Sequence, residues 1–345
     1  MTDPAADSAT TAAPGGPPNV SVIIPARDAA NTIVAAIESV LAQHPAPAQV
    51  VVAVPPDDAG TRAALAAVNT GGTAQGGGTV LLVVDNPSGG TPDGLNAGLA
   101  KASGEIVARV DAHAVLPPGY LAVAIDGLAR DEHIGNIGGI QRPVGTDEGS
   151  RAIAAAMRSP LGSGGATYRS GRRSGPVDTV YLGVFRAAAL RAVGGWDRRF
   201  TRNQDYELNV RLWGAGWRVW FDPAMVVDYR PRGDLASLAR QYRDYGRWRR
   251  ATMRLHPGSA RLRQLALPLA AAGFLMATAV ATLVGASWVG PVLLAAYAAG
   301  LLVAAVLDDD DEANALLVVA ALATMHASWT IGFALGPPSG WNDAP

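Results

Sequence analysis

The sequence predicts an α/β protein in which helices cover a parallel sheet, followed by a C-terminal group of membrane helices. Two observations carry this prediction. Short runs of β-branched residues alternate with helical stretches from residue 20 onward, as in parallel sheets covered on both faces. After residue 264 the chain becomes apolar over stretches long enough to cross a bilayer.

Composition narrows the class of protein. The 345 residues are 49% apolar, which is enough for a sizeable core. The net charge of −1 gives no general affinity for polyanions, so no nucleic-acid partner is expected. The absence of cysteine excludes disulfides and thiolate-bound metals.

The first strands and helices follow in alternation. Residues 1–19 are mostly Ala, Pro, Gly, Thr and Asp without an apolar signal-peptide core, and we expect a disordered tail there. β-Branched, apolar composition predicts strands at residues 20–25, 50–54, 79–84 and 105–111. Helices are predicted between them at residues 32–42, 61–68 and 96–102, and a flexible glycine-rich connector at 71–78.

Acidic and amide side chains follow these strands. Asp28, the turn at residues 55–58, the pair Asp85 and Asn86, and Asp111 each stand at a predicted carboxyl end. Ligands of parallel α/β sheets bind at this edge. The turn after the first strand lacks the Gly-x-Gly-x-x-Gly of dinucleotide-binding folds, and the chain has no phosphate-binding P-loop motif.

The stretch at residues 105–113 organises the prediction. Its apolar residues suit a buried strand. Asp111 and His113 are two apart, so both side chains point to one side of an extended segment. A carboxylate and an imidazole there suit a divalent cation. The alternative is that Asp111 caps a turn and His113 is an ordinary surface residue.

The second half of the chain continues the alternation. Strands are predicted at residues 135–140, 180–186 and 217–221, the last followed by a segment at 225–229, and helices at 120–129, 151–158, 187–193 and 235–254. Residues 159–176 are rich in Gly, Ser and Arg, which predicts a mobile loop that closes over substrate or a disordered insertion. Another helix begins near Asp205, whose carboxylate suits the helix N-terminus, and a plain cap is the alternative role. The arginines of residues 235–254 suit phosphate groups or anionic lipid heads.

Three membrane spans are predicted at residues 265–284, 289–307 and 313–335. The acidic run at residues 308–312 must lie in water. The arginines before the first span predict that this end of the span, and the large domain before it, are cytoplasmic. A soluble helical bundle is the alternative.

Several stretches, in this order, resemble family 2 glycosyltransferases with the GT-A fold. The likeness is strongest to bacterial membrane enzymes of the succinoglycan-glucosyltransferase type, which build exopolysaccharide on lipid carriers. It covers residues 20–258 and rests on residues 22–28, 94–99, 109–114, 181–186, 194–197, 203–209 and 241–248. The resemblance implies a mixed, mainly parallel sheet flanked by helices over residues 20–258, a membrane domain over 259–336 and a short tail at 337–345.

The resemblance also implies roles for individual residues. Asp111 and His113 match the family's metal motif, with His113 in place of a second Asp, and would bind Mg²⁺ or Mn²⁺. Asp205 matches the catalytic base of inverting members. The residues implied to hold the nucleotide are Asp111, Pro25, Arg27, Asp28 and Asn96, joined by Gln241, Arg247 and Trp248, which are similar to a Gln-x-x-Arg-Trp motif with wider spacing.

The implied activity is transfer of a sugar, with inversion, from a nucleotide-sugar donor to a lipid-linked or polysaccharide acceptor at the plasma membrane. A UDP-sugar is the favoured donor. The family's nucleobase-contacting Asp is replaced by Val54 or Pro55, so the sequence does not identify the nucleobase of the donor. The alternatives are a catalytically weak membrane scaffold that keeps the nucleotide-sugar fold, and a nucleotidyltransferase, which is disfavoured because the first strand is followed by no glycine-rich phosphate loop.

Overall fold

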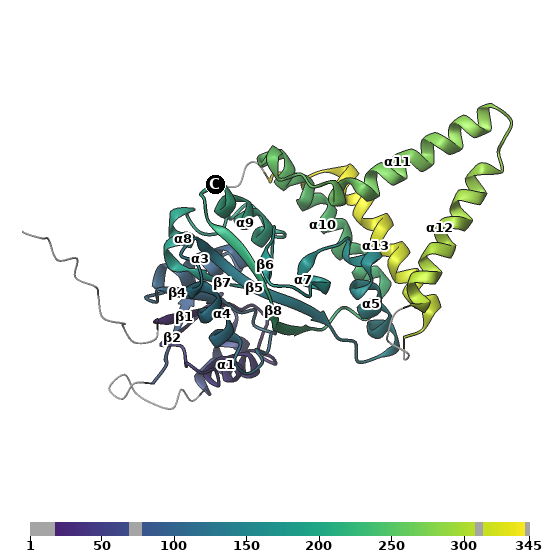
Figure 1. The fold of residues 1–345 in the computed structure, drawn as a ribbon. Coiled ribbons are helices and arrows are strands. Elements are labelled where there is room, and N and C mark those ends of the chain that lie inside the picture. The colour runs from purple at the N-terminus through teal and green to yellow at the C-terminus, as the bar shows by residue number, and fades with distance from the viewer. Residues whose placement is uncertain (1–17, 69–77, 308–312, 342–345) are drawn as a thin grey trace, which may run out of the picture.

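The computed structural model describes residues 18–68, 78–307 and 313–341. Within them, one mixed sheet has the strand order β3-β2-β1-β4-β7-β5-β8-β6 (Figure 1). The strands are β1 (Val20–Pro25), β2 (Gln49–Val54), β3 (Val80–Asp85), β4 (Ile106–Arg109), β5 (Ile134–Pro143), β6 (Gly175–Pro176), β7 (Tyr181–Arg186) and β8 (Arg218–Tyr229). The predicted architecture, a mixed and mainly parallel sheet with flanking helices and apolar helices after it, is confirmed.

The first four strands form the parallel part of the sheet. Ile23 of β1 pairs with Val51 of β2 on one side and with Arg109 of β4 on the other. The carboxyl ends of these strands therefore lie at one edge, as the sequence predicts. β7 then runs antiparallel between β4 and β5, and β8 pairs with β5 in parallel.

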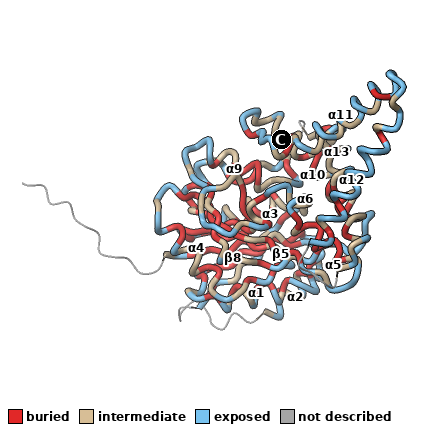
Figure 2. The backbone as a smooth tube through the Cα atoms, turned by 45° about the vertical axis from the view of Figure 1, so that its right-hand side comes forward, coloured by how far each residue is buried: buried red, intermediate tan, exposed pale blue. Residues whose placement is uncertain are grey.

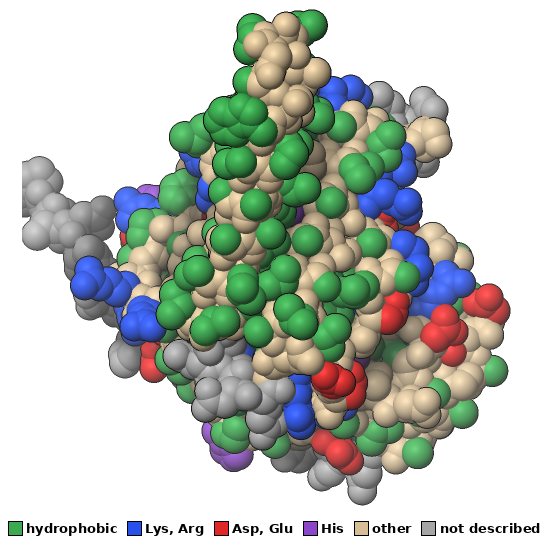
Figure 3. Space-filling view, turned by 90° about the vertical axis from the view of Figure 1, so that its right-hand side faces the viewer, with side chains coloured by type: hydrophobic (Ala, Val, Ile, Leu, Met, Phe, Trp, Pro, Cys, Tyr) green, Lys and Arg blue, Asp and Glu red, His purple; other side chains and the backbone are tan. Residues whose placement is uncertain are grey.

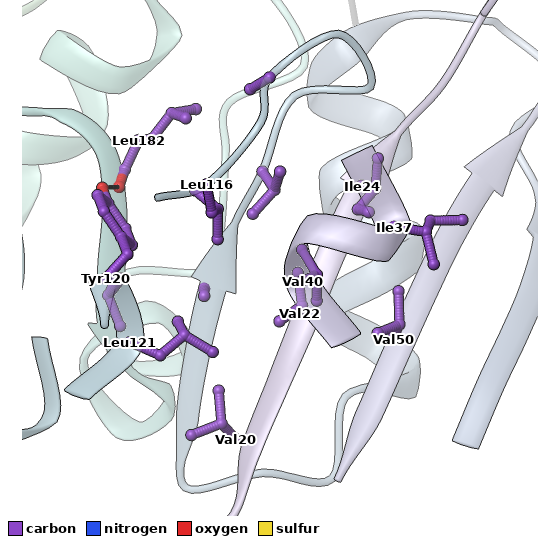
Figure 4. Packing of buried hydrophobic residues seen from close by; sticks show 14 of the residues in the cluster. Val20, Val22, Ile24, Ile37, Val40, Val50, Leu116, Tyr120, Leu121 and Leu182 are labelled. Atoms are coloured by element: carbon purple, nitrogen blue, oxygen red, sulfur yellow. Dashed lines mark hydrogen bonds between the residues drawn. The ribbon is translucent and has the colours of Figure 1, made fainter. Parts of the chain in front are cut away.

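Helices cover both faces of the sheet because its strands are apolar on both sides. Val22 and Ile24 belong to the apolar cluster under α1 and α4, whereas Ile23 faces the cluster under α3, α8 and α9. Figure 4 shows the first cluster, in which the Tyr120 hydroxyl donates to the Leu182 carbonyl at 2.7 Å. The helices up to α9 are α1 (Ile33–Leu41), α2 (Ala59–Ala66), α3 (Thr91–Lys101), α4 (Tyr120–Ala129), α5 (Glu148–Arg158), α6 (Pro160–Ser163), α7 (Thr167–Ser170), α8 (Ala187–Ala192) and α9 (Gln204–Gly214).

A long helix, α10 (Leu235–Leu255), and a short 3-10 turn (Pro257–Ser259) connect this domain to three apolar helices. These are α11 (Leu262–Leu283), α12 (Val289–Val306) and α13 (Ala315–Leu335), each long and apolar enough to span a membrane. α11 and α12 project from the body (Figure 1), are largely exposed (Figure 2) and carry apolar side chains outward (Figure 3). Such a surface suits lipid.

α13 packs against α10 through two glycines. A side chain on Gly246 of α10 would lie 2.1 Å from the Trp329 carbonyl oxygen, and one on Gly332 of α13 would lie 1.9 Å from the Arg243 carbonyl oxygen. Both distances are too short for a Cβ atom, so only glycine allows the two backbones to come this close. Small residues are typical of such contacts between membrane helices.

Several local predictions are wrong. β4 ends at Arg109, so Asp111 and His113 lie in a following turn, where the Ala114 N–H donates to the Asp111 carbonyl at 2.9 Å. The segment at residues 159–176 is not a loop throughout, because it holds α6, α7 and β6. α3 begins at Thr91, earlier than predicted, because Pro92 suits a first helical turn.

The predicted strand at residues 217–221 and the segment at 225–229 form one strand, β8, in which the pairing with β5 shifts register. The predicted tail, most of the connector at residues 71–78 and the acidic run at 308–312 lie outside the described residues.

Candidate active site

A cavity of about 690 Å³ lies beside the carboxyl end of β4, between the sheet domain and helices α10 and α13. Its polar lining comes from elements far apart in the sequence, and it includes Arg109, Asp111, His113, Asp205 and Gln241. The metal pair and the base predicted from the sequence therefore face one space. This position is also where ligands of open α/β sheets bind.

Arg109 joins the two carboxylates of the cavity. Its side chain is 7% exposed, and its Nε and Nη2 donate to Oδ1 of Asp111 at 3.1 and 2.9 Å. Its Nη1 donates to Oδ1 of Asp205. The two carboxylates are thus fixed relative to each other through one guanidinium group, whose planar fork suits such bridging.

The charges of Arg109 and Asp111 shift each other's pKa values. Burial alone would raise the pKa of Asp111, but the Arg109 guanidinium, and then His113, hold it below its ordinary value. Burial alone would lower the pKa of Arg109, yet Asp111 and Asp205 hold it above its ordinary value. Both partners therefore remain ionised at neutral pH.

Asp205 lies in the first turn of α9, but it is not the cap. The residue before the helix is Asn203, which has a left-handed backbone (φ 62°). Oδ1 of Asp205 accepts from Arg109 and from the Trp196 indole at 3.4 Å. Within the described part of the chain nothing donates to Oδ2, so that oxygen is free to accept a proton.

The donor set at the end of β4 fits a divalent cation in part. Asp111 supplies a carboxylate, and His113 is close enough to lower the pKa of Asp111. No group of three or more His, Cys, Asp or Glu side chains with metal-binding spacing occurs among the described residues. Two protein ligands suit Mg²⁺ or Mn²⁺ when water and substrate phosphate supply the others.

The description of the matching family model is "Glycosyltransferase like family 2", and it covers residues 17–251. The chain belongs to the family 2 glycosyltransferases. The succinoglycan biosynthesis protein ExoA of Rhizobium meliloti (strain 1021) is 31% identical over 258 residues, which is 73% of this chain and 76% of ExoA. The family predicted from the sequence is therefore confirmed.

Two further proteins are similar to this glycosyltransferase. A dolichyl N-acetyl-alpha-D-glucosaminyl phosphate 3-beta-D-2,3-diacetamido-2,3-dideoxy-beta-D-glucuronosyltransferase of Methanococcus voltae is 23% identical over 44% of this chain and 49% of its own. The mannosyltransferase PcManGT of Pyrobaculum calidifontis, solved with GDP-Man and Mn²⁺, superposes with a TM-score of 0.61. It is 23% identical, and the match covers 92% of this chain and 86% of that one.

The predicted nucleotide-binding residues after β1 lie outside the lining of the cavity. Pro25 ends β1, and the Arg27 side chain lies over Gly89. The Asp28 N–H donates to Oδ2 of Asp58 at 2.7 Å, while Oδ1 of Asp58 accepts from the first turn of α2. The Asp58 carboxylate, which follows β2, is thus used by the fold of the glycosyltransferase. Nucleotide contacts by Pro25, Arg27 and Asp28 remain predictions.

Asn96 also lies away from the cavity. Its amide donates to the Trp196 carbonyl at 2.7 Å and accepts from the Trp196 N–H at 2.9 Å. This pairing fixes the turn at Gly194 and Gly195, both with positive φ. Since the same turn places the Trp196 indole beside Asp205, Asn96 helps to position the Asp205 carboxylate from a distance.

The three residues predicted on α10 diverge in the structure. Gln241 lines the cavity, and its Nε2 donates to the hydroxyls of Tyr229 and Tyr245 at 3.0 and 2.8 Å. Arg247 instead donates to the Gly336 and Pro337 carbonyls at 3.1 and 3.4 Å. Trp248 is buried against Phe200, with ring centroids 5.5 Å apart. Nucleotide binding by these residues stays a prediction.

Sequence reasoning gave no role to Arg109 or Arg169, and it treated Arg249 only as one of the arginines of residues 235–254. Arg109 stands in an otherwise apolar strand, and a charge there needs a partner, so it was detectable. Arg169 and Arg249 line the cavity from α7 and α10. No local pattern distinguishes these two from the many other arginines nearby.

Proposed function

We propose that this protein is a metal-dependent, inverting hexosyltransferase. It moves a sugar from a UDP-sugar to a lipid-linked or polysaccharide acceptor in exopolysaccharide or cell-envelope synthesis. Residues 20–258 form the catalytic domain on the cytoplasmic side of the plasma membrane, residues 259–336 the membrane domain, and 337–345 a tail. The family membership and the likeness to ExoA support this proposal.

One observation carries the proposal: Asp111 and Asp205 face the same cavity and share Arg109. Single displacement with inversion needs positive charge at the leaving diphosphate and a base on the opposite side of the sugar carbon. Asp111 with His113 would hold Mg²⁺ or Mn²⁺, which supplies that positive charge when bound. PcManGT, which shares the fold, was solved with Mn²⁺.

Asp205 supplies the base. Its Oδ1 is held by Arg109 and Trp196, which fixes the carboxylate and leaves Oδ2 for the acceptor hydroxyl. The hydroxyl proton moves to Oδ2 while the acceptor oxygen bonds to the sugar carbon and the bond to the diphosphate breaks.

The membrane side of the cavity favours a lipid-linked acceptor. Trp329 and Met325 of α13 and Leu267 of α11 line the cavity together with Asp205. An acceptor attached to a membrane lipid therefore has a short path to the base. A scaffold without catalysis is the second candidate, and the pairing of Arg109 with Asp111 favours it because the guanidinium already neutralises part of the metal-binding charge.

The Asp205→Asn variant tests the proposal. We expect kcat to fall about 10²- to 10⁴-fold, with the affinity for UDP and Mn²⁺ unchanged, because the variant keeps the shape but loses the proton acceptor. Asp244→Asn is the matched control, since Asp244 also lines the cavity. Near-normal turnover of Asp205→Asn would remove the base assignment, and absence of UDP binding with Mn²⁺ by the wild type would favour the scaffold.

A further inference from the structure

Two guanidinium groups in the cavity, those of Arg169 and Arg249, each have one buried nitrogen without a hydrogen-bond partner among the described residues. Nη1 of Arg169 and Nη1 of Arg249 are buried and form no hydrogen bond with the described residues. Arg169 is only 9% exposed. Leaving a buried charged donor unsatisfied costs free energy, so native proteins seldom keep such a group unless something binds it.

Each guanidinium is held by aromatic rings instead of by a carboxylate. Arg249 stacks over the Tyr206 ring, 3.3 Å from its centroid, and makes one long hydrogen bond of 3.4 Å to Asn203. Arg169 lies 5.3 Å from the centroid of Tyr168. Such stacking orients a guanidinium and leaves its edge available for an anion. Burial lowers the pKa of Arg249 to about 10, so it is still a cation at neutral pH.

The charge of the cavity favours an anionic ligand. Among the described residues, its lining holds seven arginines and three aspartates. Two of the aspartates, Asp111 and Asp205, are already paired with Arg109. The excess positive charge therefore belongs to the other arginines of the lining, in a partly enclosed space where charges interact more strongly than in bulk water.

The contacts of Arg249 place this positive charge on the acceptor side. Asn203, which precedes α9, and Tyr206, in its first turn, lie on either side of Asp205 in the sequence, and both contact Arg249. Leu267 and Trp329 of the membrane helices line the same cavity. A ligand that satisfies all of these groups carries phosphate oxygens at one end and an apolar chain at the other.

We propose that Arg169 and Arg249 bind the phosphate of a phosphorylated lipid, the carrier of the acceptor. This assignment rests on the proposed function, because Asp205 marks the acceptor side. Arginine suits the role because its N–H groups match phosphate oxygens in bidentate geometry. The donor diphosphate is assigned to the cation that Asp111 and His113 would hold, so the two phosphate sites are distinct.

Calorimetric titration of the full chain in detergent tests the assignment, with farnesyl diphosphate as the probe. Arg169→Gln and Arg249→Gln should each weaken its binding about 10- to 100-fold, since a hydrogen bond to a charged group is worth about 1.5–3 kcal/mol. The matched controls are Arg172→Gln, three residues after Arg169, and Arg243→Gln, on the same helix as Arg249. Both are exposed and outside the cavity lining, and binding should change less than twofold.

Three further ligands identify the source of the phosphate. Farnesol, which lacks the phosphates, and inorganic diphosphate, which lacks the chain, should each bind at least tenfold more weakly than farnesyl diphosphate. UDP with Mn²⁺ should bind equally to the wild type and both variants. Loss of UDP binding with unchanged farnesyl diphosphate binding would assign the arginines to the donor, and equal binding of inorganic diphosphate would exclude the lipid.

The same titrations separate this proposal from the proposed function. Binding of farnesyl diphosphate that depends on both arginines, without binding of UDP and Mn²⁺, would keep the lipid-phosphate site and remove the transferase. Metal-dependent UDP binding, together with a farnesyl diphosphate affinity that neither variant changes, would keep the transferase and remove the lipid-phosphate site. Thermal unfolding checks the variants: both should unfold at or above the wild-type temperature, because an unsatisfied buried charge is removed, and only the wild type should gain stability from the probe.

Discussion

The two sides of the cavity use the same side chain in opposite ways. At the end of β4, Arg109 is buried with two carboxylates around it. On the membrane side, Arg169 and Arg249 are held by tyrosine rings and each keeps a nitrogen without a partner among the described residues. The matched charge of Arg109 is part of the fold, whereas the unmatched charges are available to a ligand. All three arginines have buried nitrogens, so the ion pairs with carboxylates distinguish the structural Arg109 from the two arginines available to a ligand.

The largest expected effect comes from removing the ion pairs of Arg109 with Asp111 and Asp205. Arg109→Met should reduce the free energy of unfolding by about 3–5 kcal/mol, because it leaves Asp111 and Asp205 without their shared cation. Arg249→Met should leave stability unchanged or raise it. Denaturant titration of both variants in the same detergent measures the difference. Equal destabilisation would mean that Arg249 has a structural partner after all.

A smaller effect tests how the membrane side is held in place. Gly332→Ala should cost about 1–3 kcal/mol, since the new methyl group overlaps the Arg243 carbonyl and forces α13 away from α10. Gly300→Ala on α12 is the control, because a methyl group there has no neighbour within 4 Å. Thermal unfolding followed by tryptophan fluorescence reports both. A Gly332→Ala protein as stable as the control would show that the helices do not depend on this contact.

The smallest expected effect concerns acid. The pKa of Asp111 is lower in the folded protein than in the unfolded chain, so its contribution to stability is complete above the unfolded pKa. That contribution is lost as pH falls through the folded pKa. Between pH 6 and pH 3 the wild type should therefore lose more stability than Asp111→Asn. Arg249→Gln should follow the wild-type slope, because Arg249 stays charged throughout, and a wild-type slope in Asp111→Asn would contradict the ion pair's role.

Much of the fold was accessible from the sequence because its signals are local. Buried parallel strands such as β1 and β2 are continuous β-branched runs, and the edge formed by the carboxyl ends of parallel strands is where Asp111 is expected from its position after β4. The membrane helices follow from length and hydropathy alone. Only the ends of these elements were misplaced, as at Arg109 and Thr91.

The rest depends on contacts that no local pattern encodes. The partner of Arg109, Asp205, is 96 residues away, and residues 159–176 lack the apolar periodicity that would announce two helices. Asn96, Arg247 and Trp248 matched family motifs, yet their side chains are engaged by backbone groups or apolar neighbours elsewhere. Motif spacing identifies matching positions along the chain, but it does not predict which groups each side chain contacts in the fold.

The contact between Gly246 of α10 and Gly332 of α13 couples the position of a membrane helix to the wall of the cavity. α13 is a membrane helix and α10 supplies part of the cavity wall, and their backbones touch with no side chain between them to absorb motion. A change in the tilt of α13, such as thinner or thicker bilayers impose, moves the α10 wall with it. The turnover rate then depends on the thickness of the surrounding bilayer, and a detergent micelle does not reproduce this dependence.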